Sequence, residues 1–194
     1  MGGTFDPPHL AHLVLAAAAR EAMRLDRVLF VPAGQPWRKA DRDVTSAPVR
    51  VRMVEAAVAH LEWARVSTIE VEREGPSYAA ETMRALASDG AQWWFIMGAD
   101  ALRDLPHWRE PEALIKAARL AVAGRGESPA DDLPAEVAAR FPDIDSRVDF
   151  VPMPALEVSS TALRKRLRGG QPTDVWLPDG VREVIDAEGL YRSA

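Results

Sequence analysis

Two histidines near the start of the chain stand where they could bind a phosphate. His9 and His12 are three residues apart, so on a helix both rings project to the same side. Gly2 and Gly3 precede them, and a glycine turn lets the backbone approach a bound group without an intervening side chain. The unpaired amides at a helix N-terminus attract anions. The stretch therefore predicts a phosphate site in which a turn leads directly into a helix.

The helix that would position these histidines is predicted over residues 9–24, where apolar side chains recur every three or four residues. Two other interpretations of the same stretch are open. It could be an ordinary capped helix that carries two surface histidines. Alternatively, Asp6, His9 and His12 could share a metal ion, although no third strong ligand stands out and the chain has no cysteine.

The overall composition suits one globular domain that spans residues 1–194. The chain is 47% hydrophobic and 27% charged, which provides enough apolar material for a full core. Its formal charge of -5 argues against nucleic-acid binding, which needs a basic face. The absence of cysteine excludes disulfides and thiolate chemistry. No apolar run is long enough for a membrane span and no leader precedes the glycines, so we expect a cytoplasmic protein.

The remaining elements predict an α/β fold. Strands are expected at residues 27–33, 66–71, 92–97, 120–123 and 148–153, which are short apolar runs separated by helical patterns. This alternation is typical of a Rossmann-like doubly wound parallel sheet, whose ligands lie at the carboxyl ends of the strands. In that fold a strand should precede Gly2, yet Met1 is the first residue. We therefore expect the first strand to be missing or truncated, through a start codon assigned too late or through real truncation.

The opening run GGTFDPPHLAH resembles the GGTFDP-x-H-x-G-H signature of the adenylyltransferases in the nucleotidyltransferase α/β-phosphodiesterase superfamily. Pro8 and Ala11 depart from that signature, the first where a branched apolar residue is usual and the second where glycine is usual. The resemblance implies that His12 and His9 contact the α- and β-phosphates of ATP. It also implies ATP contacts from the residues before them, Gly2, Gly3, Thr4 and Phe5.

A second motif, VSSTALR, lies near the other end of the chain and is similar to the family's I-S-S-T-x-I-R. Hydroxyl side chains at a helix start cap free amides and can bind phosphate oxygens, and an arginine one turn on adds a charge-assisted contact. The resemblance implies that Arg164 binds the outer phosphates of ATP. Lys39, in the loop of residues 34–48, would join it, with Arg38 as the reserve candidate. Lys39 could also be a solvated surface charge. The ATP contacts expected from the motif itself are Ser159, Ser160 and Thr161.

Two motifs in the middle of the chain resemble the parts of the family that bind the adenosine ribose and the pyridine substrate. The run FIMGADALRDLPHW resembles the family's F-I-x-G-x-D…L-x-x-W element. In the family, the glycine and the aspartate of this element contact the ribose, and the tryptophan stacks on the pyridine ring. The resemblance implies these roles for Gly98, Asp100 and Trp108. A tryptophan face suits a flat cationic ring. The run GPSYAAETM is similar to the family's G-P-S-Y-x-x-x-T-M element beside the pyridine substrate, which implies roles for Tyr78 and Thr82.

Two further arginines match family positions. Arg125 stands where the family often has Arg-Pro-Gly and is an expected ATP contact. Arg50 matches the arginine of the family's S-x-x-x-R pattern and could equally be an exposed helix arginine. We assign no role to residues 127–146 and predict no oligomeric state.

Taken together, the motifs most resemble the bacterial nicotinate-nucleotide adenylyltransferases, which join ATP and nicotinate mononucleotide to form deamido-NAD and pyrophosphate. The resemblance implies in-line attack of the mononucleotide phosphate on the α-phosphorus, with catalysis by positioning and charge neutralisation. Mg²⁺ would be carried by the ATP phosphates, with no metal site of the protein's own. Two alternatives are a sister enzyme with another acceptor, nicotinamide mononucleotide or phosphopantetheine, and a non-catalytic nucleotide-binding protein.

Overall fold

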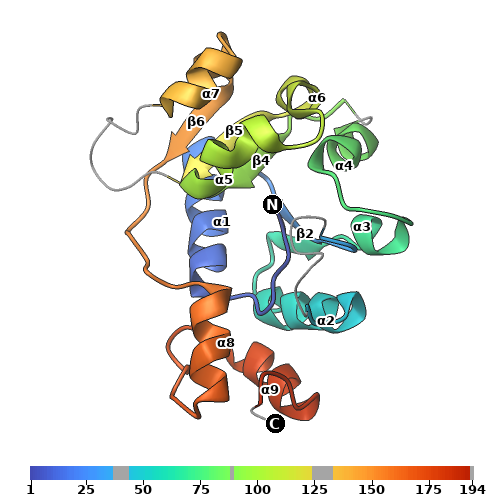
Figure 1. Cartoon of the computed structure of the whole chain (residues 1–194), viewed down its shortest axis with the longest axis vertical. Coiled ribbons are helices and arrows are strands. Elements are labelled where there is room, and N and C mark those ends of the chain that lie inside the picture. Colours follow the sequence, from blue (N-terminus) through green and yellow to red (C-terminus); the bar gives the residue numbers. More distant parts are fainter. Residues whose placement is uncertain (37–43, 88–89, 124–132, 193–194) are drawn as a thin grey trace. The chain divides into compact units, whose positions relative to one another are not determined.

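The computed structural model describes residues 1–36, 44–87, 90–123 and 133–192 (Figure 1). Strands and helices alternate along the chain, which confirms the α/β class. The strands are β1 (Gly2–Gly3), β2 (Val28–Pro32), β3 (Ala64–Val66), β4 (Trp94–Met97), β5 (Arg119–Ala123) and β6 (Val148–Val151). The helices are α1 (Leu10–Met23), α2 (Ala47–Val58), α3 (Ile69–Glu72), α4 (Ala79–Leu86), α5 (Ala99–Asp104), α6 (Pro111–Ala117), α7 (Ala135–Arg140), α8 (Ser160–Arg168) and α9 (Asp179–Ala187), with 3-10 turns η3 (Leu105–His107) and η4 (Ile144–Arg147). No helix in these described ranges is long and apolar enough to cross a membrane.

The chain divides into two compact units, each built from separate stretches of sequence. Unit 1 comprises Met1–Gly2, Leu15–Leu25 and Ser77–Ala155. Unit 2 comprises Gly3–Val14, Asp26–Pro76 and Leu156–Ala194. Helix α1 therefore begins in unit 2 and ends in unit 1. The single domain expected over residues 1–194 stays a prediction.

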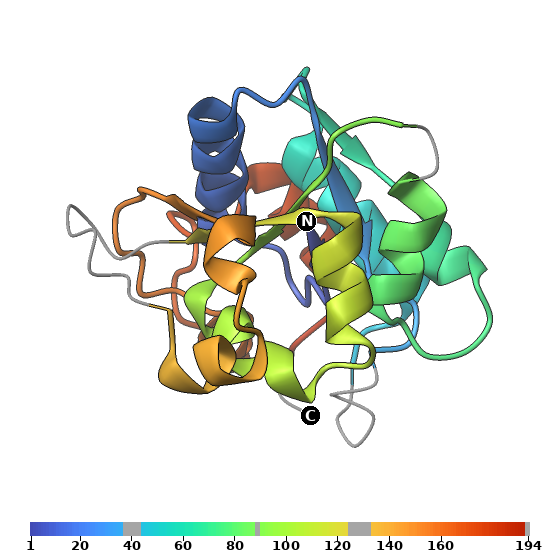
Figure 2. The ribbon, with the colours of Figure 1, turned by 90° about the horizontal axis from the view of Figure 1, so that it is seen from above.

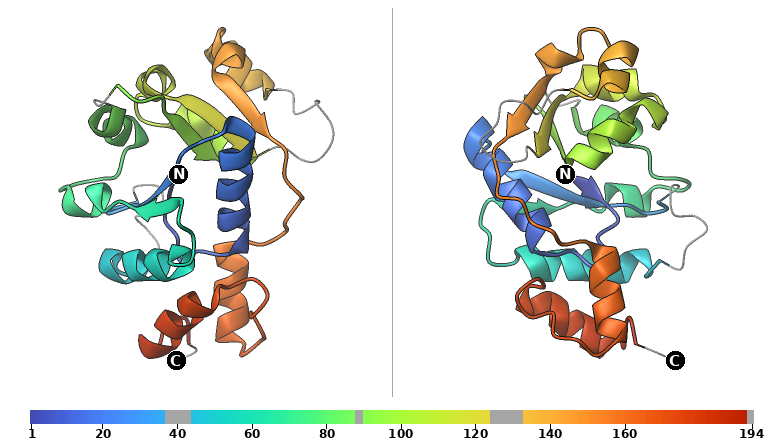
Figure 3. Two further views of the ribbon diagram at one scale, coloured as in Figure 1. Left: turned by 180° about the vertical axis from the view of Figure 1, so that it is seen from behind. Right: turned by 60° about the vertical axis from the view of Figure 1, so that its left-hand side comes forward.

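The sheet of unit 2 has the strand order β1-β2-β3. β2 and β3 run parallel, with Phe30 opposite Val66, and the carbonyl of Gly3 accepts a 2.9 Å hydrogen bond from the amide of Ala33. Helix α2 packs against β2 and β3, and α9 packs on α2, as both views in Figure 3 show. Gly3 and the residues after it, here called the N-terminal turn (residues 3–9), are thereby attached to the edge of this sheet.

The sheet of unit 1 has the order β4-β5-β6, and both pairs of neighbours are parallel. Helices α5 and α6 pack against β5, and α4 packs on α6 (Figure 2). The core between these elements is apolar, as expected for parallel strands covered by helices. Its largest buried side chains include Met83, Phe95, Leu102, Leu105, Leu114 and Leu120.

A polar cluster joins the three strands of unit 1 near their starts. The carboxylate of Asp149 accepts hydrogen bonds from Trp94 Nε1 at 2.8 Å and from Arg119 Nη2 at 2.6 Å. The hydrogen bond from Arg119 lowers the pKa of Asp149, and the same bond raises the pKa of Arg119. Because each of these residues comes from a different strand, the cluster fixes the strand register.

The structure adds two details to the expected parallel fold. The hydrogen-bonded strands of the described residues form two three-stranded sheets. The glycine pair itself forms β1, which is only two residues long. A strand of that length offers few backbone groups for pairing, and in the part of the chain that the structure describes it lies beside β2 in the sheet order.

The strand predicted over residues 66–71 is wrong. β3 ends at Val66 and α3 follows, with the amide of Val71 bonded to the carbonyl of Thr68 at 2.7 Å. A short apolar run is compatible with either a strand or a helical turn. Here the turn brings the carbonyl of Glu70 against Gly34, where a Cβ atom would lie 2.0 Å from the carbonyl oxygen. Only glycine fits that approach, so α3 fixes the path of the chain after β2.

Candidate active site

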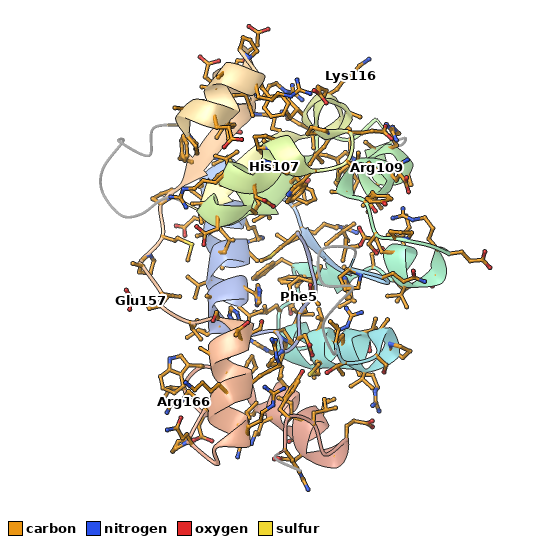
Figure 4. The ribbon with its side chains drawn as sticks, in the orientation of Figure 1. Phe5, His107, Arg109, Lys116, Glu157 and Arg166 are labelled. Carbon is orange, nitrogen blue, oxygen red and sulfur yellow. The ribbon has the colours of Figure 1, made fainter. Side chains whose placement is uncertain are left out.

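Phe5 shapes the N-terminal turn, in the segment that leads from the N-terminus to α1 (Figure 4). It has a left-handed backbone conformation, with φ of 51°, and it is 2% exposed. For a bulky residue this conformation is uncommon, and such residues cluster at functional sites. The Phe5 ring meets the His12 ring edge-on, with 5.0 Å between centroids. A Cβ atom at Gly3 would lie 3.0 Å from the Phe5 ring, so the missing side chain of Gly3 makes room for Phe5.

His9 and His12 stack on each other at the start of α1, with 3.8 Å between ring centroids and 27° between planes. The three-residue spacing predicted this pairing. The amide of His9 donates to Nδ1 of His12 at 3.1 Å. Because a nitrogen that accepts a hydrogen bond carries no proton, the neutral His12 ring has its proton on Nε2. Nε2–H is therefore the group that His12 would offer to a phosphate oxygen.

His9 is buried, with 6% of its surface exposed. Its Nδ1 atom is enclosed and has no hydrogen-bond partner among the residues that the structure describes. Burial lowers the pKa of His9 to about 4, so the ring is neutral at neutral pH. An enclosed polar atom without a partner is a recognised sign of a position that a ligand or an ordered water occupies.

We expect the stability of the fold to depend on His9 between pH 6.5 and pH 4. The unfolded residue takes up a proton at its ordinary pKa of 6.5 and the folded one only at about 4, so the unfolded state binds more protons in this window. The free energy of unfolding is therefore highest above pH 6.5 and decreases as the pH falls. The contribution of His9 should decrease by about 2 kcal/mol between pH 7 and pH 5, which urea unfolding at the two pH values would measure.

The variant His9→Asn should lack this part of the pH dependence. The matched control is His60→Asn, because His60 is exposed and its substitution should leave the pH dependence as in the unmodified protein. A His9→Asn variant whose stability decreases with pH as steeply as that of the unmodified protein would contradict the argument from burial.

Asp6 is a buried carboxylate in the N-terminal turn, 3% exposed. Its Oδ1 accepts a hydrogen bond from the Tyr191 hydroxyl, and its Oδ2 accepts one from the Thr45 amide at 3.4 Å. Both oxygens are thus bonded within the protein. This argues against the alternative metal site of Asp6, His9 and His12, and the described part of the chain contains no group of three histidine or carboxylate side chains placed to hold a metal.

Arg50 is buried, which corrects the alternative of an exposed helix arginine. It is 1% exposed, and burial lowers its pKa. Its guanidinium donates to three backbone carbonyls, those of Thr45 at 2.7 Å, Thr4 at 2.9 Å and Gly34 at 3.2 Å. Since Gly34 and Thr45 flank residues 35–44, Arg50 connects both ends of that segment to the N-terminal turn.

Helix α8 begins at the second motif and binds the N-terminal turn. The Ser159 hydroxyl accepts a hydrogen bond from the amide of Ala162 at 3.2 Å, so it caps the helix as predicted. The Ser160 hydroxyl donates to the carbonyl of Pro7 at 2.9 Å, and Arg164 Nη1 donates to the carbonyl of Asp6 at 2.6 Å. The two motifs therefore meet, and the side chains expected at phosphates bind the backbone of the turn.

The other polar groups near these helix starts also have protein partners. The Thr161 hydroxyl accepts from Arg164 Nη2 at 3.4 Å. The amide of Leu10, the first residue of α1, donates to the carbonyl of Trp176 at 2.9 Å. Arg166 of α8 points away from α9 (Figure 4), and its guanidinium lies 4.6 Å from the centre of the Trp176 ring. One of the positively charged side chains of α8, Arg166, therefore packs against an aromatic ring of the protein.

Trp108 lies half-buried in unit 1. Its Nε1 donates to the carboxylate of Asp104 at 3.0 Å, and its ring meets Phe95 edge-on, with 5.9 Å between centroids. The hydrogen bond fixes the plane of the indole, and the edge contact with Phe95 holds it against the core. The side chain thus has a defined orientation, as a stacking platform requires.

The remaining candidate residues of unit 1 lie at the starts of α4 and α5. Tyr78 precedes α4, and its carbonyl accepts from the hydroxyl of buried Thr82 at 3.3 Å. Gly98 precedes α5, and a Cβ atom there would meet no described atom within 4 Å. Asp100 follows, with a side chain that is 95% exposed and paired with Arg103 at 2.5 Å. Packing among the described residues therefore does not require glycine at position 98.

Three candidates, Arg38, Lys39 and Arg125, lie outside the described residues. In contrast, sequence reasoning gave no role to Tyr191, whose hydroxyl binds Asp6. It also did not identify Arg50 as buried, although Arg50 stands three residues before the buried Met53 on α2. A charged residue at an apolar position of the helical period was the available signal.

The sequence matches the profile of the family described as Cytidylyltransferase-like over residues 1–166. This match covers most of the chain, and the chain belongs to the cytidylyltransferase-like family. A relative in Roseiflexus sp. (strain RS-1), named "Probable nicotinate-nucleotide adenylyltransferase", is 42% identical over 193 residues, which are 99% of this chain and 96% of the relative. A protein of the same name in Methylibium petroleiphilum is 41% identical over 187 residues, which are 95% of this chain and 85% of that protein.

A solved structure of the Plasmodium falciparum nicotinic acid mononucleotide adenylyltransferase, complexed with NaAD, has a similar fold. The TM-score is 0.73, and the match covers 98% of this chain and 94% of that chain at 19% sequence identity. At this identity the likeness shows that the two proteins share the fold.

Proposed function

We propose that this chain transfers the adenylyl group of ATP to nicotinate mononucleotide, which yields deamido-NAD and pyrophosphate. The observation that carries the proposal is the stacked pair His9 and His12, next to a turn that Ser160 and Arg164 of the second motif bind. Relatives named for this reaction are similar over nearly the whole chain. An enclosed turn with imidazoles at its end suits phosphoryl chemistry that needs positioning and no protein nucleophile.

For the phosphates, the proposal assigns His12 to the α-phosphate through Nε2–H and His9 to the β-phosphate. The Nδ1 atom of His9, which has no hydrogen-bond partner among the described residues, supports the second assignment. Negative charge beside His9 favours its protonated form, so ATP binding should raise the pKa of this ring. The two imidazoles would then stabilise the charge that develops on the α-phosphate and on the departing pyrophosphate.

The second motif has two proposed roles. Ser160 and Arg164 fix the backbone of the turn through the hydrogen bonds given above. The side chain of Arg164 is 17% exposed, and its charge also favours the outer phosphates of ATP. We propose the same role for Lys39. The remaining proposed ATP contacts are Gly2, Gly3, Thr4, Phe5, Arg125, Ser159 and Thr161.

The contacts to the nucleosides are proposed for candidate residues between Tyr78 and Trp108. Gly98 and Asp100 are proposed to bind the adenosine ribose, because a Cβ atom at Gly98 would meet no described atom within 4 Å and the Asp100 carboxylate is exposed. Trp108 is proposed to stack on the pyridine ring, and Tyr78 and Thr82 to lie beside that substrate. The fixed plane of the Trp108 indole supports its assignment.

Nucleotidyltransferases of this kind use a divalent metal, and we propose that Mg²⁺ is the ion and that the ATP phosphates carry it. The bonded oxygens of Asp6 support this assignment, because the carboxylate of the turn already has protein partners. When bound, the ion neutralises phosphate charge. Since both substrates are phosphorylated metabolites of the cell interior, the proposed site of action is the cytoplasm.

The test is pyrophosphate release from ATP and Mg²⁺ with three acceptors compared side by side. Nicotinate mononucleotide should give a kcat/KM at least tenfold above those of nicotinamide mononucleotide and phosphopantetheine. Preference for one of the latter would identify a sister enzyme. ATP binding without release from any acceptor would overturn the proposal in favour of a non-catalytic nucleotide-binding protein.

Trp108→Ala should raise the KM for nicotinate mononucleotide about tenfold, because stacking on a cationic ring contributes roughly 1–2 kcal/mol. The KM for ATP should stay unchanged. Steady-state kinetics with each substrate varied in turn would measure both. The control is Trp94→Ala, which removes another indole of unit 1, bonded to Asp149, and should lower stability without changing the KM. An unchanged KM for the mononucleotide in Trp108→Ala would show that the stacking assignment is wrong.

A further inference from the structure

The side chain of Tyr191 reaches from the segment after α9 to the N-terminal turn. Its hydroxyl donates to Oδ1 of Asp6 and accepts from the Thr45 hydroxyl at 3.3 Å. Tyr191 has a φ of 57°, a left-handed conformation that is a genuine outlier for a bulky residue. Such a conformation persists where the surrounding contacts determine it. The contact with Asp6 is therefore a specific feature of this end of the chain.

The Tyr191 hydroxyl remains a donor over the whole working range of pH. Burial raises the pKa of Tyr191, and the hydrogen bond to Asp6 raises it further. A protonated phenol can donate to a carboxylate, and a charged acceptor strengthens that bond. Asp6 is 3% exposed, so water does not replace this donor easily.

The position of Asp6 is transmitted to the histidines by a stiff connection. Pro7 and Pro8 separate Asp6 from His9, and the ring of each proline fixes its φ. Both prolines are buried. A displacement of Asp6 must therefore shift His9, whose amide and ring both contact His12.

From this arrangement we propose that Tyr191 is a positioning residue for adenylyl transfer. Its hydroxyl fixes the Asp6 carboxylate, and Asp6 fixes the place of the His9 and His12 rings through the two prolines. The inference rests on the proposed function for its effect on rate. Its effect on the two rings is independent of which reaction the protein performs.

Tyr191→Phe tests the role with the loss of one oxygen atom. We expect kcat with ATP and nicotinate mononucleotide to fall about tenfold, because small displacements of reacting groups reduce rates steeply. The KM of the mononucleotide should stay within about twofold, since Tyr191 and Asp6 are not among its proposed contacts. An unchanged kcat would overturn the proposal.

Glu188→Gln is the control for general loosening of the same segment. Glu188 lies three residues before Tyr191, and its carboxylate pairs with Arg52 of α2 at 2.6 Å. It should leave kcat unchanged. If Glu188→Gln and Tyr191→Phe lower the melting temperature equally and also lower kcat equally, the role of Tyr191 is structural and the proposal fails.

A double-mutant cycle tests whether Tyr191 acts through Asp6. In an Asp6→Ala background, Tyr191→Phe should cause no further loss of kcat, because the partner of the hydroxyl is already gone. If the loss of kcat in the double variant equals the product of the losses in the two single variants, Tyr191 acts by another route and the proposal is overturned.

A measurement without turnover separates this inference from the proposed function. The chain has four histidines, so the imidazole signals of ¹⁵N-histidine-labelled protein are few enough to assign by NMR. Tyr191→Phe should shift the signals of His9 and His12 and leave those of exposed His60 and His107 in place. Unmoved His9 and His12 signals would overturn the positioning role even if the protein proved inactive with all three acceptors. If the protein is inactive with all three acceptors but Tyr191→Phe shifts the His9 and His12 signals, the proposed function fails and the positioning role stands.

Discussion

His12→Ala is expected to lower kcat for adenylyl transfer by about 100- to 1,000-fold, the range found when a donor to a transition-state oxyanion is removed. The amide of His9 occupies Nδ1 of His12 and places the ring proton on Nε2. Alanine removes that donor. The backbone hydrogen bond between the amide of His12 and the carbonyl of His9, 2.9 Å long, does not involve the side chain and should persist. Steady-state kinetics with ATP and nicotinate mononucleotide would measure the loss, and thermal unfolding would show that the fold is intact.

Three variants make this experiment specific to His12. His60→Ala and His107→Ala remove exposed histidines and should leave kcat within about twofold. His12→Gln places an amide donor near the position of Nε2 and should recover part of the lost rate. A folded His12→Ala variant with a near-normal kcat would remove this residue from the mechanism.

Local sequence patterns were sufficient to predict most elements. The apolar spacing over residues 9–24 became α1, and the short apolar runs at 27–33, 92–97, 120–123 and 148–153 became β2, β4, β5 and β6. These predictions depend on which face of an element is buried, and that information is present in a window of about 11–18 residues. The run at residues 66–71 misled because it was too short to distinguish a strand from the turn of helix that it forms.

The meeting of the two motifs was implied by the resemblance, but the partners of their side chains were not. Arg164 and Asp6 are 158 residues apart in sequence, and Tyr191 and Asp6 are 185 apart. No local pattern encodes a contact at such a distance. The choice between a phosphate and a backbone carbonyl as partner of Ser160 also depends on the path of the turn, which the left-handed Phe5 sets. The sequence could thus name Ser160 and Arg164 but not their contacts, and it gave no role to Tyr191.

The position of Arg50 in the helical pattern indicated its burial, but the sequence-based interpretation did not use this indication. It lies on the same face of α2 as Met53, Val54 and Ala57, all of which are buried. An arginine within the apolar face of a helix either lies at the edge of that face, where its side chain is exposed, or is buried and donates hydrogen bonds to several acceptors. The structure shows the second case, with three backbone carbonyls bound to one guanidinium.

Arg50→Met should lower the free energy of unfolding by about 3–5 kcal/mol, the range for removing one partner of a buried charged group. Methionine fills much of the volume but donates no hydrogen bond, so the carbonyls of Thr4, Gly34 and Thr45 lose their donor. Two of these carbonyls flank residues 35–44 and the third belongs to the N-terminal turn. The variant should therefore also lose most of its kcat at temperatures where it remains folded. Urea unfolding at pH 7 would measure the first effect, and single-temperature kinetics the second.

Arg52→Met on the same helix is the matched control. Arg52 pairs with Glu188, but its side chain is 51% exposed and that of Glu188 is 36% exposed, so the pair should contribute at most about 1 kcal/mol. The two substitutions remove the same charge from α2 and differ in burial and in the partners lost. If both variants unfold at the same urea concentration, the three carbonyl contacts do not stabilise the fold and Arg50 is not the link between the turn and residues 35–44. We expect Arg50→Met to unfold at a much lower urea concentration than Arg52→Met, and only Arg50→Met to lose most of its kcat.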